Sequence, residues 1–508
     1  MDQRKTGILL SYLNFGLNAL IMLIYVPMLL HYVSKEQYGI YQMIGSFIGV
    51  IAVLDFGLSA TVTRFVARAD AKNEPQQAQR TIDAAAFLYV ILTGLLILIS
   101  IGGYFLISPI YGHALSPADL ATAQQIYLIL VLNFAVCVPG NLFLGLVQAK
   151  ERFVFLQCLY LCTTVLTPLA IWGALCWKAN VVGVVWVQTA ANISLVLGYY
   201  LYCKIRLHIH VHPRGCNVSL LRQLFGFSFF VFLGNIAGQI SSRLGPLVLG
   251  LLAGALAVAN YYIASQLLMA FTMIPSLISG VFLPKLSGDF ATQNSLAVHN
   301  DIFCKTGRLQ TLVALLLLIG FVLLGQVFLR LWLGPGNEVC YGLAIVLMSC
   351  SLLNIVQGVS NSVLMAINKY RFSAYLGIAT ALLNVLLAFP LVKYYGTMGC
   401  AIALVLSTCL VRGILMNWYY HKIGLHLKAF FRALGPIAGW SLVVMIVLGM
   451  VWHYWPVQAT WRSFILHGIC IVAVYGAVMA RFVLNRFEWD IVREICAKCH
   501  FPKVVSDN

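Results

Sequence analysis

Long apolar runs separated by short polar segments cover the chain from its first residues almost to its last. A helix that crosses a bilayer needs about 20 mostly apolar residues, and in lipid it must satisfy its backbone polar groups internally. Fourteen windows meet this requirement, so the pattern predicts fourteen transmembrane helices. The windows are residues 7–30, 39–61, 84–106, 126–148, 154–177, 181–202, 225–252, 257–283, 309–329, 341–366, 372–392, 398–418, 434–452 and 463–482.

The first window follows Arg4 and Lys5, as the apolar core of a signal peptide would. Its run from Gly7 to Leu30 is longer than such a core, and no Ala-x-Ala type cleavage site accompanies it. We therefore expect this segment to be retained as the first span.

Composition agrees with a chain that lies almost entirely in the membrane. Hydrophobic residues make up 61% of the 508 residues and charged residues only 9%, whereas soluble domains carry about 25% charged residues. The fourteen cysteines are scattered through apolar runs and do not form a secreted disulfide framework. The expected fold is all-α and polytopic.

The net charge of +17 at first suggests a nucleic-acid partner, but the placement of the basic residues gives another explanation. With the N-terminus in the cytoplasm, 25 of the 32 Lys and Arg residues fall in cytoplasmic segments and five in outer loops. Such a bias over short loops predicts that both termini are cytoplasmic. It also removes the need for nucleic acid.

An internal repeat links the two halves of the chain. Pro27 and Pro246 are 219 residues apart, as are Lys150 and Lys369 in the strings AKERF and NKYRF. Spans 1–6 therefore match spans 7–12 in the same orientation, a parallel repeat typical of transporters. The expected division is an N-lobe at 1–202, a C-lobe at 203–420, two added spans at 421–482 and a cytoplasmic tail at 483–508.

Polar residues form stripes on three predicted helices, at spacings that put each set on one helix face. Two readings stay open: hydrogen bonds between helices, or the wall of a water-filled cavity between the halves. The stripes are Ser11, Asn14 and Asn18; Ser228, Asn235, Gln239 and Ser242; and Asn354, Gln357 and Asn361.

Two arginines lie within predicted spans. Arg243 comes one turn before Pro246, and Arg412 lies in the inner half of span 12. A charged residue at this depth is unfavourable and usually functional, so either could face an anionic group in the cavity. The alternative is that the side chains reach back to the membrane interface.

Asp55, near the inner end of span 2, is the only acid well inside any span, and Arg64 follows nine residues later. They are either a helix-end acid with a cytoplasmic basic residue, or a pair that gates the path or captures a headgroup. The scarcity of intramembrane carboxylates argues against a proton- or sodium-driven exporter.

No metal or cofactor is predicted. The string CAKCH at Cys496–His500 matches a haem-attachment motif, but the predicted topology places it in the cytoplasm. The string HIHVH at His208–His212 is better explained as a solvated basic loop than as a metal site. The motifs Gly45-x-x-x-Gly49 and Gly250-x-x-x-Gly254 permit close helix packing. The chain has no P-loop or other nucleotide motif.

The stretch from Ile24 to Asp70 resembles the start of Wzx-type polysaccharide-biosynthesis flippases, members of the multidrug/oligosaccharidyl-lipid/polysaccharide exporter superfamily. The resemblance rests on Y-G-x-Y (Tyr38, Gly39, Tyr41), on D-F-G-L from Asp55 to Leu58, and on AKERF. It covers about the first 155 residues; beyond them the match is span number, repeat and length. It implies two six-helix lobes around a central cavity, alternating access, and a lipid-linked oligosaccharide as substrate.

We therefore expect a flippase in the bacterial inner membrane that moves a polyprenyl-diphosphate-linked oligosaccharide outward. Its expected partners are membrane lipids and the polysaccharide polymerase machinery. The alternatives are a small-molecule or drug exporter of the same fold, a peptidoglycan-precursor flippase, and a membrane polysaccharide polymerase. The enzyme reading is poor because the longest outer loop, residues 107–125, offers only His113 and Asp119 as catalytic groups.

Overall fold

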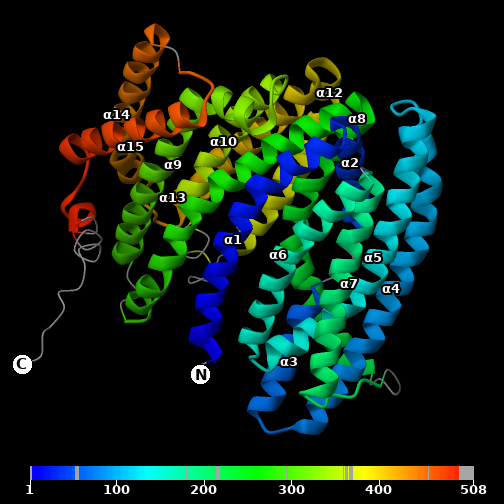
Figure 1. The fold of residues 1–508 in the computed structure, drawn as a ribbon. Coiled ribbons are helices and arrows are strands. Elements are labelled where there is room, and N and C mark those ends of the chain that lie inside the picture. Colours follow the sequence, from blue (N-terminus) through cyan, green and yellow to red (C-terminus); the bar gives the residue numbers. More distant parts are fainter. Residues whose placement is uncertain are drawn as a thin grey trace, which may run out of the picture. The chain divides into compact units, whose positions relative to one another are not determined.

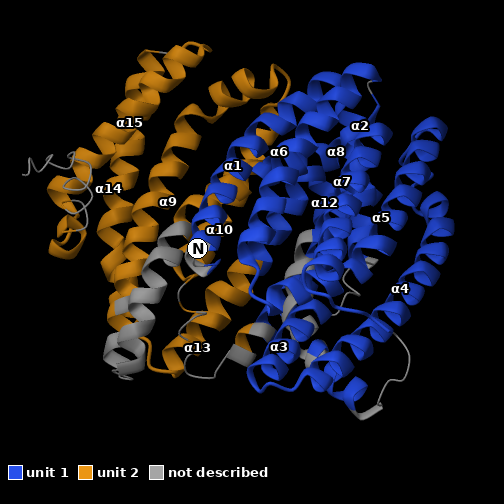
Figure 2. Ribbon diagram, turned by 60° about the horizontal axis from the view of Figure 1, so that its bottom comes forward, with its two compact units in different colours: residues 1–266, 374–407 blue, residues 267–373, 408–508 orange. Residues whose placement is uncertain are grey.

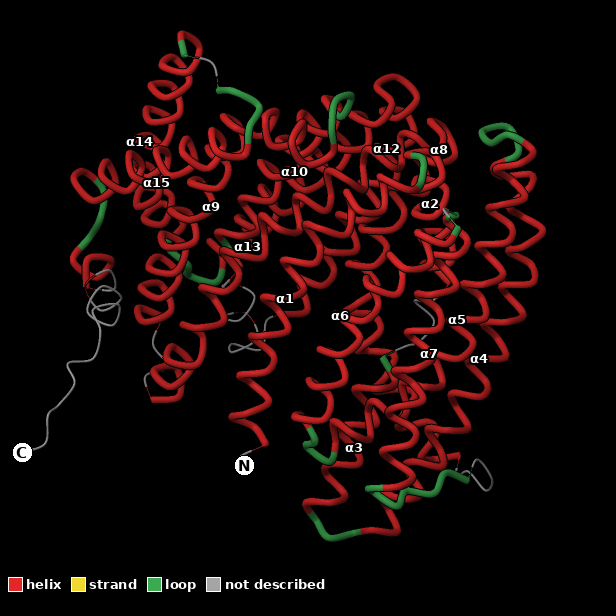
Figure 3. The backbone as a smooth tube through the Cα atoms, viewed as in Figure 1, coloured by secondary structure: helices red, strands yellow, loops and turns green. Residues whose placement is uncertain are grey.

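The computed structural model describes residues 3–51, 57–178, 180–212, 218–292, 296–358, 360, 364, 370–455, 457–490 and 493. Some side chains inside these ranges, chiefly those of 229–242 and 277–299, are not among those described. Throughout the described residues the regular structure is helical, with no strand (Figure 1). Short loops and turns connect the helices (Figure 3).

The helices follow the predicted spans in order. They are α1 (Gln3–Tyr32), α2 (Lys35–Ile51), α3 (Leu58–Ala71), α4 (Pro75–Tyr111), α5 (Pro117–Ala149), α6 (Phe153–Trp177), α7 (Val181–Ile205), α8 (Val218–Thr292), α9 (Leu296–Leu333), α10 (Glu338–Val356), α12 (Tyr370–Thr408), the π-helix η2 (Cys409–Met416), α13 (Asn417–Lys422), α14 (Leu427–Tyr454) and α15 (Trp461–Phe482).

Among the described residues, eleven helical stretches are long and apolar enough to cross a membrane. Two of them, Arg243–Ser276 and Tyr375–Lys422, each contain a backbone break and run across two predicted spans. The second predicted span is divided between α2 and α3 by residues 52–56, which lie outside the described part. The all-α polytopic fold with about fourteen spans is therefore confirmed.

Glycines mark the breaks in the two longest helices. Gly254 in α8 has φ 79° and Gly396 in α12 has φ 55°, a region of backbone space that side chains disfavour. Past Gly396 the chain folds back on itself. This is shown by the close approach of Gly399 to Leu391, since a Cβ on Gly399 would overlap the Leu391 carbonyl. In a continuous helix those residues would be about 12 Å apart. α12 is thus two helices joined by a tight turn.

The helix surfaces are apolar where a soluble protein would be polar. Leu9, Phe105 and Leu386 each expose about 70% of their surface, and Met450 exposes 61%. Large exposed apolar side chains on most of the helices suit contact with lipid tails and would be unfavourable in water.

The first compact unit comprises Met1–Gln266 and Ala374–Ser407 (Figure 2). One core cluster joins α3, α4, α5 and α7 around the buried side chains Val66, Tyr89 and Leu146. At one end of this cluster, Lys150 forms an ion pair with Asp70 at 2.9 Å and so ties the end of α5 to the end of α3.

The second compact unit comprises Leu267–Ser373 and Thr408–Asn508. Its core includes a stack of Phe303 on Phe430, with ring centroids 4.1 Å apart. Beside it, the buried Arg308 guanidinium binds both carboxylate oxygens of Glu488, with N–O distances of 2.7 and 3.0 Å. Arg308 also donates to the carbonyl of Ala433 on α14, so one side chain links α9, α14 and the segment after α15.

Candidate functional site

Arg243 lies half-buried on α8, against the small-residue face of α2. Its Nη1 donates a hydrogen bond to the carbonyl of Gly45 at 3.4 Å. A Cβ on Gly49 would stand 2.8 Å from the Arg243 Cζ, whereas a Cβ on Gly45 would meet nothing within 4 Å. The Gly45-x-x-x-Gly49 motif therefore accommodates an arginine side chain, in addition to any role in packing helices.

Two tyrosine hydroxyls lie within electrostatic range of this guanidinium. Arg243 interacts electrostatically with the hydroxyls of Tyr41 and Tyr262. Tyr262 in turn shares a hydrogen bond of 2.5 Å with the hydroxyl of Ser46 on α2. Two helix faces thus bring a cation, two phenols and an alcohol together within the first unit. The arrangement offers hydrogen-bond donors to an anionic or hydroxylated ligand.

The string Y-G-x-Y builds this arrangement. Gly39 lets α2 approach the chain after the Gly254 break, because a Cβ there would overlap the carbonyl of Ala255. Tyr38 is buried with 1% of its surface exposed, and the Tyr41 hydroxyl interacts electrostatically with Arg243. Gly39 thus gives the close approach, Tyr38 is a buried anchor of the helix, and Tyr41 lies within electrostatic range of the arginine.

A second polar cluster lies in the second unit, between α10 and the segment η2–α13. Arg412 Nη1 donates to Asn354 Oδ1 at 3.3 Å, where Asn354 is exposed and Arg412 is half-buried. Gln357, with 6% exposure, donates to Asn417 Oδ1 at 2.8 Å. The structure therefore brings the predicted residues Asn354, Gln357 and Arg412 together. Arg412 also interacts electrostatically with Tyr420.

The stripe on α1 divides into two parts. Asn14 accepts a hydrogen bond from Thr164 at 3.1 Å and donates to Gln157 at 3.5 Å, so it links α1 to α6. Ser11 donates to the carbonyl of Gly7 on its own helix. The side chain of Asn18 is exposed. Asn14 thus acts as a hydrogen bond between helices, and only Asn18 is open to a ligand or lipid.

Several predicted residues lie outside the described part of the chain. Asp55 and Asn361 are among them, as are the side chains of Asn235 and Gln239. Arg64 is exposed on α3, and the pairing of Asp55 with Arg64 stays a prediction.

The HIHVH string, one of the two metal-like motifs in the sequence, lies in an exposed loop. His208, His210 and His212 are exposed, and Gln79 fixes their backbone by donating to the carbonyl of His210 at 2.6 Å. Among the described residues, no group of three or more His, Cys, Asp or Glu side chains could hold a metal ion. The CAKCH string lies outside the described residues.

Residues 5–288 match the family described as "Polysaccharide biosynthesis protein". The chain belongs to this family. A putative O-antigen transporter of Escherichia coli K12 is 25% identical over 438 residues, which cover 82% of this chain and 96% of that protein. A probable flippase of Haloferax volcanii, AglR, is 25% identical over 334 residues, covering 63% and 65% of the two chains.

Solved structures agree on the fold of this family member. The lipid II flippase MurJ in an inward closed conformation superposes with a TM-score of 0.70 at 13% identity, over 94% of this chain and 98% of that one. An inward-facing multidrug resistance MATE family transporter gives a TM-score of 0.62 at 14% identity, over 82% and 95%. The chain therefore has the fold of these structures and is a multi-pass membrane protein.

The sequence did not indicate four residues of the two polar clusters. Near Arg243 these are Tyr41 and Tyr262. In the second cluster they are Asn417, which binds Gln357, and Tyr420, which interacts with Arg412. Tyr41 is part of Y-G-x-Y, so that string carried a usable signal for it. The other three lie in apolar, tyrosine-rich runs, where an interfacial aromatic belt gives the same pattern.

Proposed function

We propose that this chain moves a polyprenyl-diphosphate-linked oligosaccharide, such as an O-antigen, capsule or exopolysaccharide repeat unit, from the inner to the outer leaflet by alternating access. The family match and the relatives named as an O-antigen transporter and a flippase support this function. The lipid tail stays in the bilayer while the polar head crosses. Both termini are cytoplasmic in this scheme, and the polymerase machinery takes the product on the outer side.

The observation that carries the proposal is the setting of Arg243. An arginine at the centre of a span is unfavourable by about 2.5–3.5 kcal/mol on insertion scales. Within the described residues, the groups recorded around Arg243 are a backbone carbonyl and two tyrosine hydroxyls, which are neutral. A passing diphosphate would bring negative charge to this guanidinium, whose planar group can bind two phosphate oxygens at once.

The tyrosines extend the same site toward the sugar. The hydroxyls of Tyr41 and Tyr262 interact electrostatically with the guanidinium. An aromatic ring can lie against the apolar face of a pyranose while its hydroxyl bonds to a sugar oxygen. The diphosphate and the first sugar of a lipid-linked oligosaccharide are adjacent, as are the arginine and the tyrosines here.

Replacing Arg243 tests the function directly. Arg243→Ala should abolish surface polysaccharide at an unchanged membrane level of the protein, and lipid-linked repeat units should build up on the cytoplasmic face. Arg243→Lys should keep partial activity, because it keeps the charge and loses the fork. Arg330→Ala is the control, since Arg330 is exposed and forms a surface ion pair with Glu338.

Two outcomes would count against this function. Normal polysaccharide in cells that carry Arg243→Ala would remove Arg243 from the transport path. Loss of polysaccharide without accumulated lipid-linked units would place the defect before the flipping step.

A further inference from the structure

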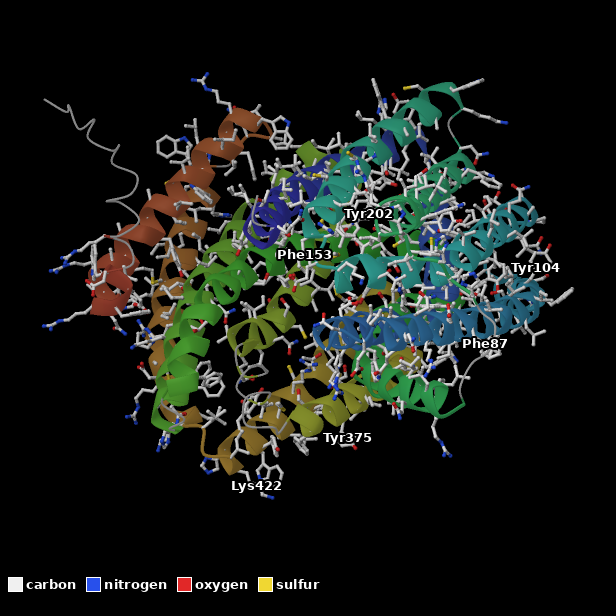
Figure 4. The ribbon with its side chains drawn as sticks, turned by 90° about the horizontal axis from the view of Figure 1, so that it is seen from below. Phe87, Tyr104, Phe153, Tyr202, Tyr375 and Lys422 are labelled. Atoms are coloured by element: carbon white, nitrogen blue, oxygen red, sulfur yellow. The ribbon has the colours of Figure 1, made fainter. Side chains whose placement is uncertain are left out.

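Two aromatic stacks recur in the two units at one sequence offset. Phe155 stacks on Tyr202 in the first unit, with ring centroids 3.9 Å apart and planes 15° apart. Phe372 stacks on Tyr419 in the second unit, at 4.0 Å and 28°. Each member of the second pair lies 217 positions after a member of the first pair, two fewer than the 219 positions that separate AKERF from NKYRF. Tyr202 is labelled on α7 in Figure 4.

Two hydrogen bonds next to these stacks keep the same offset. Cys203 donates to the carbonyl of Phe143, and Tyr420 shares a hydrogen bond with Ser360, again 217 positions on in both members. The packing of α7 on α5 in the first unit therefore has the same register as the packing of α13 on the segment that follows α10 in the second.

A third pair fixes the register farther along the helices. Asn192 donates to Asn133 at 3.3 Å in the first unit, and Thr408 forms a hydrogen bond with Cys350 in the second. The offset is 217 for the α10 member and 216 for Thr408. One extra residue is thus accommodated between Thr408 and Tyr419, the interval that contains the π-helix. A π-helix closes its hydrogen bonds over five residues, which makes room for such a residue.

Because the register is shared, residues at equivalent positions of the two units can be compared directly. Asn354 corresponds to Cys137, and Arg412 corresponds to Leu195 or Val196. The first unit packs the same helices with small or apolar side chains at these positions, and α7 is α-helical there. Helix packing therefore does not require an arginine, an asparagine or a π-helix at this place. π-Helical turns are rare and are frequently found at functional sites.

The pair presents hydrogen-bond donors outward. A guanidinium has five N–H donors, and one Nη1 bond of Arg412 goes to Asn354 Oδ1. That bond uses the acceptor of the Asn354 amide and leaves its NH₂ as a donor on an exposed side chain. The hydrogen bond from Gln357 to Asn417, one turn away, holds the two helix segments together beneath it. A surface rich in donors and carrying a positive charge suits an oxyanion.

We propose that Arg412 and Asn354 form an oxyanion-binding site that contacts the substrate during transport, in addition to Arg243. The ligand is a phosphate of the polyprenyl diphosphate or a carboxylate of an acidic sugar. This role rests on the proposed flippase function. It assigns to the second unit a polar site that its repeat counterpart in the first unit lacks.

The sharpest test transplants the first-unit residues into the second unit. The double variant Asn354→Cys/Arg412→Leu should reach the membrane at the wild-type level and keep its Tm, because the same packing exists in the first unit. In detergent, its affinity should fall by about tenfold or more for at least one probe, as expected for a lost hydrogen bond to a charged group. The probes are farnesyl diphosphate and polyprenyl-diphosphate disaccharides with or without a uronic acid. Arg462→Leu, on the exposed start of α15, is the control.

The probes separate the two sources of the oxyanion. Weaker binding of farnesyl diphosphate identifies the phosphate, and weaker binding of the uronic-acid disaccharide alone identifies the carboxylate. Unchanged affinity for every probe, with Arg243→Ala still defective, would overturn this site and leave the flippase function standing. A variant that fails to fold would also overturn it, because the polar pair would then be needed for packing. A wild-type protein that binds none of the probes would remove both proposals.

Discussion

The guanidinium carbon of Arg243 lies 2.8 Å from the position that a Cβ of Gly49 would occupy. A helical glycine on α2 therefore makes the space in which an arginine on α8 can lie. The atom in the way is the far end of a flexible side chain, so a larger residue at Gly49 moves the charge without disturbing the backbone. This allows the position of the arginine to be tested separately from its presence.

Gly49→Ala should reduce transport while the protein becomes no less stable. The new methyl group displaces the guanidinium, and losing one charge-assisted contact with the substrate lowers the flipping rate by about tenfold. Alanine in a helix is also favoured over glycine by roughly 0.5–1 kcal/mol, so the Tm should hold or rise. The measurements are surface polysaccharide in cells and Tm of the purified protein.

Gly94→Ala is the matched control, because a Cβ on that helical glycine of α4 meets nothing within 4 Å. It should gain the same helix stability and keep full transport. Equal transport by the two variants would show that the place of Arg243 against α2 does not matter for function.

Breaking the Arg308–Glu488 pair should strongly destabilise the second unit. The side chains are 8% and 3% exposed, so Glu488→Ala leaves a buried unpaired cation, a change worth about 3–5 kcal/mol. The double variant Arg308→Met/Glu488→Leu should recover most of that loss, because it removes both charges. Tm of the purified protein in detergent reports both effects.

The exposed pair of Lys305 with Asp301 on the same helix provides the comparison. Asp301→Ala removes a 2.6 Å ion pair between side chains that are 43% and 58% exposed. It should change the free energy of unfolding by less than about 0.5 kcal/mol. A comparable loss in Asp301→Ala and Glu488→Ala would contradict the role assigned to burial.

Asn14 and Asn18 should respond differently to substitution by leucine. Asn14→Leu removes the hydrogen bonds to Gln157 and Thr164 and should cost about 0.6–2 kcal/mol of helix association. Asn18→Leu should leave stability unchanged, because the Asn18 side chain is exposed. Thermal unfolding measures both; a larger loss from Asn18→Leu would reverse the assignment.

The predicted topology can be tested by labelling whole cells with an impermeant thiol reagent, in a background without reactive native cysteines. Cysteines at Ala71 and Lys204 should be protected, and one at Ala118 should react. All three positions are exposed, so burial does not explain a difference between them. The opposite pattern would reverse the orientation and the positive-inside argument together.

The sequence alone determined that this chain is a helical membrane protein and where most of its spans lie. Backbone groups in lipid leave few alternatives to a helix, so a run such as Val181–Ile205 needs no tertiary information. The Y-G-x-Y string also indicated the family, which the match over residues 5–288 shows.

Only the tertiary structure decided what the polar residues do, because hydropathy says which residues are polar but not what faces them. Asn14 and Asn354 look alike in sequence, yet the first links two helices and the second lies exposed beside Arg412. The one-residue difference in register that accompanies η2 changes no hydropathy window, and the space left for Arg243 depends on a glycine from another helix. Such relations join side chains more than fifty positions apart, and no local pattern in the sequence records them.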